Sequence, residues 1–149
     1  MKRFDCLRAI APYFREELVV TNLGGVRHEW HYLRPYPGNY HLQNLGLTSS
    51  VGLGLALALP HRKVVVFDGD GSMLLNLGGL ATMANLRPKN LILTVFDNEC
   101  YESSRGAPTA TSRGPIRKPG AAGTTRRPHP FVLLDKFSCQ DYHRVRRLR

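Results

Sequence analysis

Two short apolar runs, each followed directly by a polar turn, constrain the fold of this 149-residue chain more than any other feature. Residues 64–67 (Val-Val-Val-Phe) precede the turn at residues 69–72 (Gly-Asp-Gly-Ser), and residues 91–96 precede residues 97–98 (Asp-Asn). One helix-sized segment, residues 75–86, lies between the two runs. Strand, helix and strand in that order predict a βαβ unit, whose strands are parallel and whose crossover is right-handed.

The two turns predict a ligand site. Parallel strands end at the same edge of a sheet, and ligands of open α/β sheets bind at that edge, so we expect Asp70 and Asn98 to lie side by side. The Asp70 carboxylate would repel a bare phosphate unless a cation lies between them. Mg²⁺ prefers oxygen ligands, which Asp70, the Asn98 amide and a loop carbonyl, best placed at Cys100, can supply. The expected ligand is therefore a magnesium-bound phosphate or diphosphate compound.

Other interpretations of the first turn fit less well. An EF-hand loop beginning at Asp68 needs Gly and Glu where this chain has Met73 and Gly79. A dinucleotide-binding fingerprint needs a third Gly where Leu74 stands, and the Gly-Lys-Ser/Thr of a P-loop is absent from the sequence. An ordinary Asp/Gly turn remains the simple alternative, although the second polar turn at the same edge argues against it.

The residues of this predicted site resemble those of a known family. Gly69-Asp70-Gly71, followed after twenty-six residues by Asn98, resembles the diphosphate-binding motif of thiamine diphosphate enzymes. Residues 46–56 and 97–103 narrow the resemblance to the cofactor-binding chain of the sulfopyruvate and phosphonopyruvate decarboxylase group, over about residues 1–112. The resemblance implies an α/β fold, an open parallel sheet with helices on both faces, incomplete at its C-terminal end.

The resemblance also implies a set of cofactor-binding residues. They are Leu45, Gly69, Asp70, Gly71, Ser72, Asn98 and Cys100. Among them, Asp70, the Asn98 side chain and the Cys100 carbonyl correspond to the metal ligands. Gly71 and Ser72 fall where backbone and hydroxyl groups meet the diphosphate. Leu45 lies where an apolar residue holds the cofactor in its bent conformation, with a plain buried leucine as the alternative. No catalytic residue is identified in this chain.

The implied activity is decarboxylation of a small 2-oxo acid with thiamine diphosphate and Mg²⁺. In such enzymes the thiazolium carbanion of the cofactor adds to the keto group, and the cofactor acts as the electron sink. A glutamate that contacts the pyrimidine ring activates the cofactor and belongs to a second domain, which no segment of this chain resembles. The resemblance therefore implies a hetero-oligomer, in which a pyrimidine-binding partner subunit carries that glutamate, and no turnover by this chain alone.

The C-terminal quarter differs in composition from the rest. Residues 113–149 contain ten Lys/Arg and two Asp, a net charge of +8, whereas residues 1–112 have a net charge of +2. Repeated Pro and Gly oppose regular structure there, and we expect disorder after about Ser112. Three interpretations stay open: a basic arm for nucleic acid or an acidic surface, a genuine divergent end, and an out-of-frame translation, which we favour.

The alternative function is a non-catalytic protein that binds nucleic acid through this tail. Few aromatic residues interleave with the basic ones there, so we do not expect nucleic-acid binding. We expect no membrane association either, because the longest apolar stretch, residues 51–59, is far shorter than the ~20 residues of a membrane span. Asp5 and Arg8 interrupt any secretory signal, and an odd number of cysteines indicates a reducing compartment, so we expect a cytoplasmic protein.

The remaining pattern predicts elements around the site. Residues 18–21 form a short strand, followed by a glycine turn at residues 22–25 that either approaches the diphosphate or is a simple turn. Ser49 and Ser50 can cap a helix that runs to Leu59, in which Gly52 and Gly54 indicate a close backbone approach.

Three further predictions concern packing. Apolar spacing at Leu77, Leu80, Ala81 and Ala84 predicts the buried stripe of the crossover helix. Trp30 and the tyrosines after it predict an aromatic loop. Residues 131–134 are a weak candidate for a fourth strand.

Overall fold

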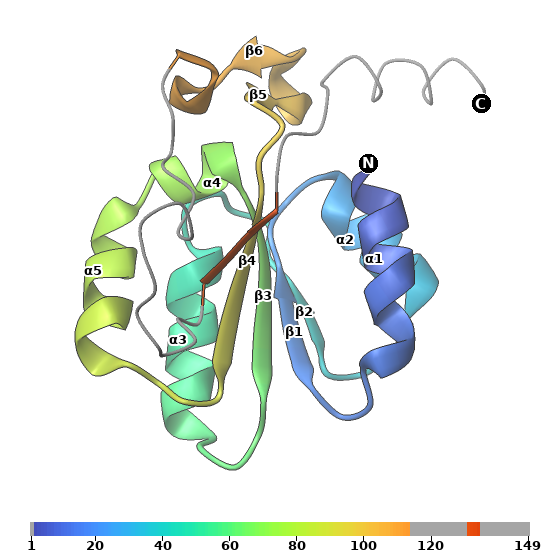
Figure 1. Cartoon of the computed structure of the whole chain (residues 1–149), viewed down its shortest axis with the longest axis vertical. Helices are drawn as coiled ribbons and strands as arrows, with labels where there is room; N and C mark the ends of the chain where they lie inside the picture. Colours follow the sequence, from blue (N-terminus) through green and yellow to red (C-terminus); the bar gives the residue numbers. More distant parts are fainter. Residues whose placement is uncertain (1, 114–130, 135–149) are drawn as a thin grey trace, which may run out of the picture.

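The computed structural model describes residues 2–113 and 131–134, which form an α/β fold around one parallel sheet (Figure 1). The sheet has five strands in the order β2-β1-β3-β4-β7, and every neighbouring pair is parallel. The strands are β1 (Leu18–Thr21), β2 (Asn39–His41), β3 (Val64–Gly69), β4 (Leu91–Phe96) and β7 (Phe131–Leu134). The predicted open parallel α/β sheet is confirmed.

Helices cover both faces of the sheet (Figure 1). They are α1 (Arg3–Ile10), α2 (Gly25–Leu33), α3 (Thr48–Ala58), α4 (Asp70–Leu74) and α5 (Leu77–Leu86), with 3-10 turns η1 (Ala11–Tyr13), η2 (Glu102–Ser104) and η3 (Ala110–Arg113). A separate antiparallel hairpin of β5 (Cys100–Tyr101) and β6 (Ala107–Pro108) stands above the carboxyl edge of the sheet (Figure 1).

The three strands expected from the sequence are present, and two more extend the sheet. β2 was not predicted because it has only three residues and no apolar run. β7 is the weak candidate at residues 131–134, and it pairs with β4 from Leu93↔Phe131 to Phe96↔Leu134. The disorder expected for residues 113–149 otherwise lies outside the described residues.

The core on the α3 and α5 side of the sheet is aliphatic. It contains alternate residues of β1, β3 and β4 together with Leu53, Ala56 and Met83 from the helices. Gly52 of α3 lies directly on β3, where an added Cβ would overlap a methyl group of Val66. A close approach was also expected at Gly54, but a Cβ there meets no atom within 4 Å, so that part of the prediction is wrong.

The core on the α1 and α2 side is aromatic at its centre. Trp30 is fully buried, and its ring centroid lies 4.7 Å from that of Phe14 and 4.9 Å from that of Phe67. The expected aromatic loop is therefore wrong for Trp30, which belongs to the helix α2. Tyr32, two residues later on the same helix, is exposed. Helical spacing separates the two residues onto different faces.

The crossover between β3 and β4 contains two helices rather than one. α4 ends at Leu74, and α5 starts again at Leu77. The expected buried stripe is mostly wrong: Leu77, Ala81 and Ala84 are exposed, Leu80 is partly buried, and Met83 is the buried residue of α5. Because the helix is interrupted at residues 75–76, α5 has a different orientation from a continuous helix, and Met83 lies on its buried face.

Strand register sets the positions of the two polar turns. β3 and β4 pair from Val64↔Leu91 to Gly69↔Phe96, so Asp70 and Asp97 each follow the last residue of a paired strand. β1 runs parallel to β3 and ends with Thr21 opposite Phe67. The turn that begins at Asn22 therefore reaches the same edge, as predicted.

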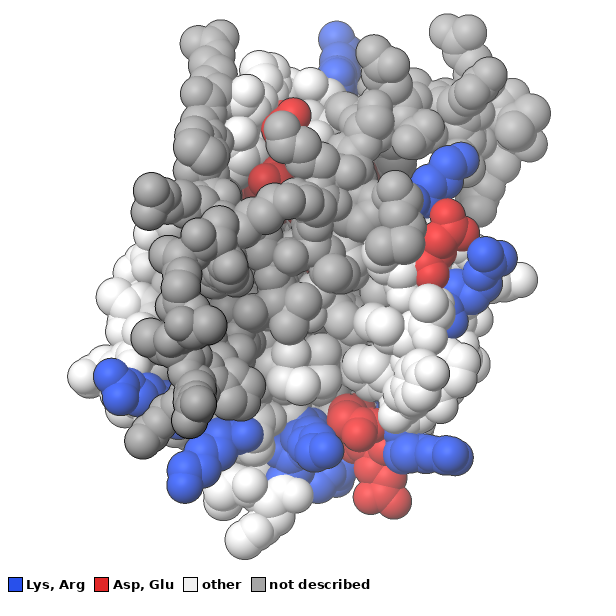
Figure 2. Space-filling view, viewed as in Figure 1, with Lys and Arg blue, Asp and Glu red and all other residues white. Residues whose placement is uncertain are grey.

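Surface charge is mixed on the face of the molecule shown in Figure 2. On the face in Figure 2, the basic side chains of the described residues lie mainly at the margins, with acidic side chains among them. Within the described ranges, no helix is long and apolar enough to cross a membrane.

The two glycines of α3 provide a matched test of helix packing. Gly52→Ala should lower the free energy of unfolding by about 1–3 kcal/mol, because the new methyl group overlaps Val66. Gly54→Ala should raise it by about 0.5–1 kcal/mol, because alanine favours the helix and the site is open. Urea unfolding of both variants measures the difference. Equal stabilities would show that α3 does not lie against β3 in this way.

Candidate functional site

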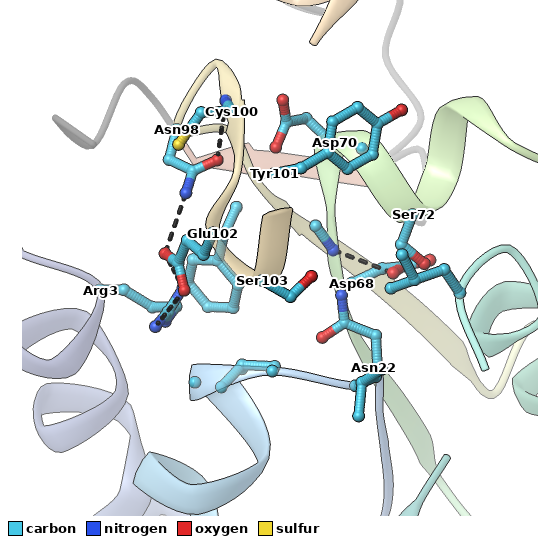
Figure 3. A pocket seen from close by; sticks show the side chains of 18 residues that line it. Arg3, Asn22, Asp68, Asp70, Ser72, Asn98, Cys100, Tyr101, Glu102 and Ser103 are labelled. Carbon is cyan, nitrogen blue, oxygen red and sulfur yellow. Dashed lines mark hydrogen bonds and ion pairs between the residues drawn. The ribbon is translucent and has the colours of Figure 1, made fainter. Parts of the chain in front are cut away.

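One pocket lies at the carboxyl edge of the sheet, where the turns after β1, β3 and β4 meet (Figure 3). Its volume is about 60 Å³, the space of a few water molecules. All seven residues predicted for cofactor binding line it. The structure therefore brings the whole predicted set together, namely Leu45, Gly69, Asp70, Gly71, Ser72, Asn98 and Cys100.

Asp70, the first residue of α4, is 2% exposed, and its carboxylate is held by hydroxyl groups from beyond the hairpin. Its Oδ2 accepts hydrogen bonds from Thr109 Oγ1 at 2.6 Å and from Thr111 Oγ1 at 2.9 Å. Thr111 Oγ1 also lies 3.0 Å from Asp97 Oδ1, and the two hydroxyl oxygens lie 2.7 Å apart. Two hydroxyl protons cannot serve these four contacts at once.

The electrostatics of this cluster favour a cation. Burial raises the pKa of Asp70, the hydrogen bonds from Thr109 and Thr111 oppose that rise, and the neighbouring Asp97 carboxylate adds to it. A positive ion at Asp70 would relieve both the burial of its charge and its repulsion from Asp97. The donor chemistry of the site therefore fits a bound metal ion.

Asn98 follows β4 and is held from both ends of its amide (Figure 3). Its Nδ2 donates to Glu102 Oε1 at 2.9 Å, and its Oδ1 accepts from the backbone N–H of Cys100 at 3.2 Å. Among residues 2–113 and 131–134, no group of three or more His, Cys, Asp and Glu side chains could hold a metal. A metal here would instead be bound by one carboxylate with amide and carbonyl oxygens, a set that suits a hard cation.

The small residues of the turn have mixed roles. An added Cβ at Gly71 would overlap two carbon atoms of the Tyr101 ring, so packing of that ring requires this glycine. Ser72 Oγ accepts the buried backbone N–H of Gly46 at 3.0 Å, and its hydroxyl also hydrogen-bonds the Asp68 carboxylate. Leu45 lines the pocket beside them, which fits either a cofactor contact or a buried leucine.

Several polar residues that line the pocket were not among the predicted cofactor ligands, and four of them have contacts that bear on the site. Asp68 is 1% exposed, and burial raises its pKa to about 6. Asp68 Oδ2 and Asn22 Oδ1 are buried and have no hydrogen-bond partner in the part of the chain that is described. Arg3 and Glu102 reach the pocket from distant segments and form an ion pair at 2.8 Å. The position of Asp68, between the apolar run at residues 64–67 and the Gly-Asp-Gly motif, could have identified it from the sequence. No sequence pattern links Arg3 to the site.

Comparison with known proteins identifies the family of the chain. The family model for the C-terminal TPP-binding domain of thiamine pyrophosphate enzymes matches residues 22–147. The match continues past residue 112, where the resemblance was expected to end.

Two archaeal relatives are each named sulfopyruvate decarboxylase subunit beta. The protein from Methanothermobacter thermautotrophicus is 44% identical over 105 residues, which cover 70% of this chain and 56% of the relative. The protein from Methanocaldococcus jannaschii is 42% identical over 114 residues, which cover 75% of this chain and 60% of the relative.

A bacterial relative extends the comparison to a second named activity. The phosphonopyruvate decarboxylase of Streptomyces viridochromogenes is 36% identical over 132 residues, 88% of this chain and 33% of the relative. The chain thus spans little more than half of the archaeal subunits and a third of the bacterial enzyme. These matches, together with the pocket at the carboxyl edge, show that the chain belongs to the thiamine pyrophosphate enzyme family, through its C-terminal TPP-binding domain.

Proposed function

We propose that this chain is the thiamine diphosphate- and Mg²⁺-binding subunit of a 2-oxo acid decarboxylase of the sulfopyruvate and phosphonopyruvate type. The observation that carries the proposal is the convergence of Asp70 and Asn98 on one pocket at the carboxyl edge, in a chain of this family. The relatives named as sulfopyruvate and phosphonopyruvate decarboxylases support the substrate class.

Three groups would hold the metal: the Asp70 carboxylate, the Asn98 amide oxygen and the Cys100 carbonyl. Mg²⁺ commonly binds one or two protein groups together with substrate phosphates, so diphosphate oxygens and water would complete its shell. The turn at residues 69–72 would face the diphosphate, with the Ser72 hydroxyl among its polar groups. When bound, thiamine diphosphate supplies the electron sink for loss of CO₂ from the 2-oxo acid.

A partner subunit is part of the proposal. The archaeal relatives carry the name subunit beta. We therefore expect the pyrimidine half of the cofactor, and the glutamate that activates it, to be covered by a second chain.

Replacing the charged metal ligand tests the binding site. Asp70→Ala should weaken Mg²⁺-dependent binding of thiamine diphosphate by roughly hundredfold or more, because even the groups around a metal ligand contribute roughly ten- to hundredfold. Titration calorimetry with and without Mg²⁺ measures the change. Asp5→Ala is the matched control, since it removes an exposed carboxylate on α1. Equal affinities for the two variants would contradict the metal assignment.

Turnover tests the need for a partner. The purified chain with thiamine diphosphate and Mg²⁺ should release no CO₂ from sulfopyruvate or phosphonopyruvate above the rate without protein. Addition of the matching pyrimidine-binding chain should start turnover. Decarboxylation by the single chain would show that it contains the complete active site.

A further inference from the structure

We propose that Glu102 is a positioning residue that turns the amide oxygen of Asn98 toward the metal. The inference rests on the proposed function and extends it to groups outside the predicted motif. The contact that carries it is the hydrogen bond from Asn98 Nδ2 to Glu102 Oε1, 2.9 Å long (Figure 3).

The chemistry of an amide explains why this contact matters. A carboxylate only accepts hydrogen bonds, so the NH₂ group of Asn98 must face Glu102. The amide oxygen then points away from Glu102, toward the backbone N–H of Cys100 at 3.2 Å. That N–H uses one lone pair of the oxygen and leaves the second for a metal. With the amide reversed, two N–H donors would face each other and no oxygen would be presented.

Glu102 is itself held by a partly buried arginine. Arg3 Nη1 donates to the same Glu102 Oε1 at 2.8 Å, and Arg3 Nη2 lies 3.4 Å from Oε2. The side chains of Arg3 and Glu102 are 15% and 17% exposed, so the pair is largely shielded from water. This ion pair holds the Glu102 carboxylate in one orientation, with Oε1 facing Asn98 Nδ2.

Arg3 is anchored on its other side. Its Nε and Nη2 donate to Glu29 on α2, at 2.8 and 3.0 Å. Gly25, the first residue of α2, leaves room for this guanidinium, because an added Cβ would overlap Arg3 Nη2. A chain of polar contacts thus runs from α2 through α1 to the loop after β4, by way of Glu29, Arg3, Glu102 and Asn98. Groups around metal ligands that fix their orientation contribute roughly ten- to hundredfold to metal affinity.

Glu29 offers a matched control for Glu102. Both carboxylates pair with Arg3, but Asn98 Nδ2 donates to Glu102. The full-length chain is titrated with Mg²⁺ at a fixed concentration of thiamine diphosphate. Glu102→Leu should weaken Mg²⁺ binding by roughly tenfold, whereas Glu29→Leu should change it by less than about threefold. Glu102→Gln, which retains an acceptor oxygen, should restore binding to within about threefold of the wild type.

The same Glu102 substitution in a second parent protein, the Asn98→Asp variant, distinguishes a positioning role from general destabilisation. In Asn98→Asp protein the ligand is a carboxylate, which Glu102 would repel rather than orient. Glu102→Gln should therefore strengthen Mg²⁺ binding in that background by roughly tenfold, the opposite sign to the loss caused by Glu102→Leu. This comparison does not use Glu102→Leu, so it stays informative even if that variant fails to fold. Thermal melts without metal show whether the Leu variants at 29 and 102 lose similar stability.

The outcomes distinguish the two proposals. If the wild type binds Mg²⁺ and cofactor but the Leu variants at 29 and 102 lose affinity equally, Glu102 has no positioning role and the proposed function stands. An unchanged or weaker affinity on Glu102→Gln in the Asn98→Asp background overturns the positioning role in the same way. Absence of Mg²⁺-dependent binding by the wild type overturns the proposed function, and the role of Glu102 with it.

Discussion

The parallel pairing of β3 with β4 is the contact on which the rest of the site depends. It sets Gly69 opposite Phe96, so the turns that follow begin at the same level of the sheet. The chain after Asn98 then folds into the β5–β6 hairpin and returns Thr109 and Thr111 to the carboxylate of Asp70. A shift in strand register would separate Asp70 from Asn98 and from both hydroxyl groups.

Charge is the second constraint on this edge of the sheet. Asp68 and Asp70 are buried, and Asp97 lies close enough to Asp70 to raise its pKa. Such a cluster opposes folding unless hydroxyl groups or a cation compensate it. The threonine protons are too few for the contacts they make, a shortfall that a bound cation would relieve. Arg3, a basic residue of the pocket lining, is already paired with Glu29 and Glu102.

Short sequence patterns predicted the features that depend on residues close together in the chain. The apolar runs before Asp70 and Asn98 sufficed for the βαβ unit and for the shared edge. The burial of Trp30 was missed because its neighbours are charged or polar, and its partners Phe14 and Phe67 are distant in sequence. The hydrogen bonds of Arg3 to Glu102 join residues 99 positions apart, and no spacing rule predicts such a contact.

The central claim is that Asp70, Asn98 and the Cys100 carbonyl bind one metal ion that also holds the diphosphate. Crystals grown with thiamine diphosphate and Mn²⁺, a Mg²⁺ substitute with measurable anomalous scattering, test it most directly. We expect one anomalous peak in contact with Asp70, the Asn98 amide oxygen, the Cys100 carbonyl and two diphosphate oxygens. A peak bound by Asp68 or Asp97 without Asn98, or a diphosphate bound with no metal peak, would contradict the account.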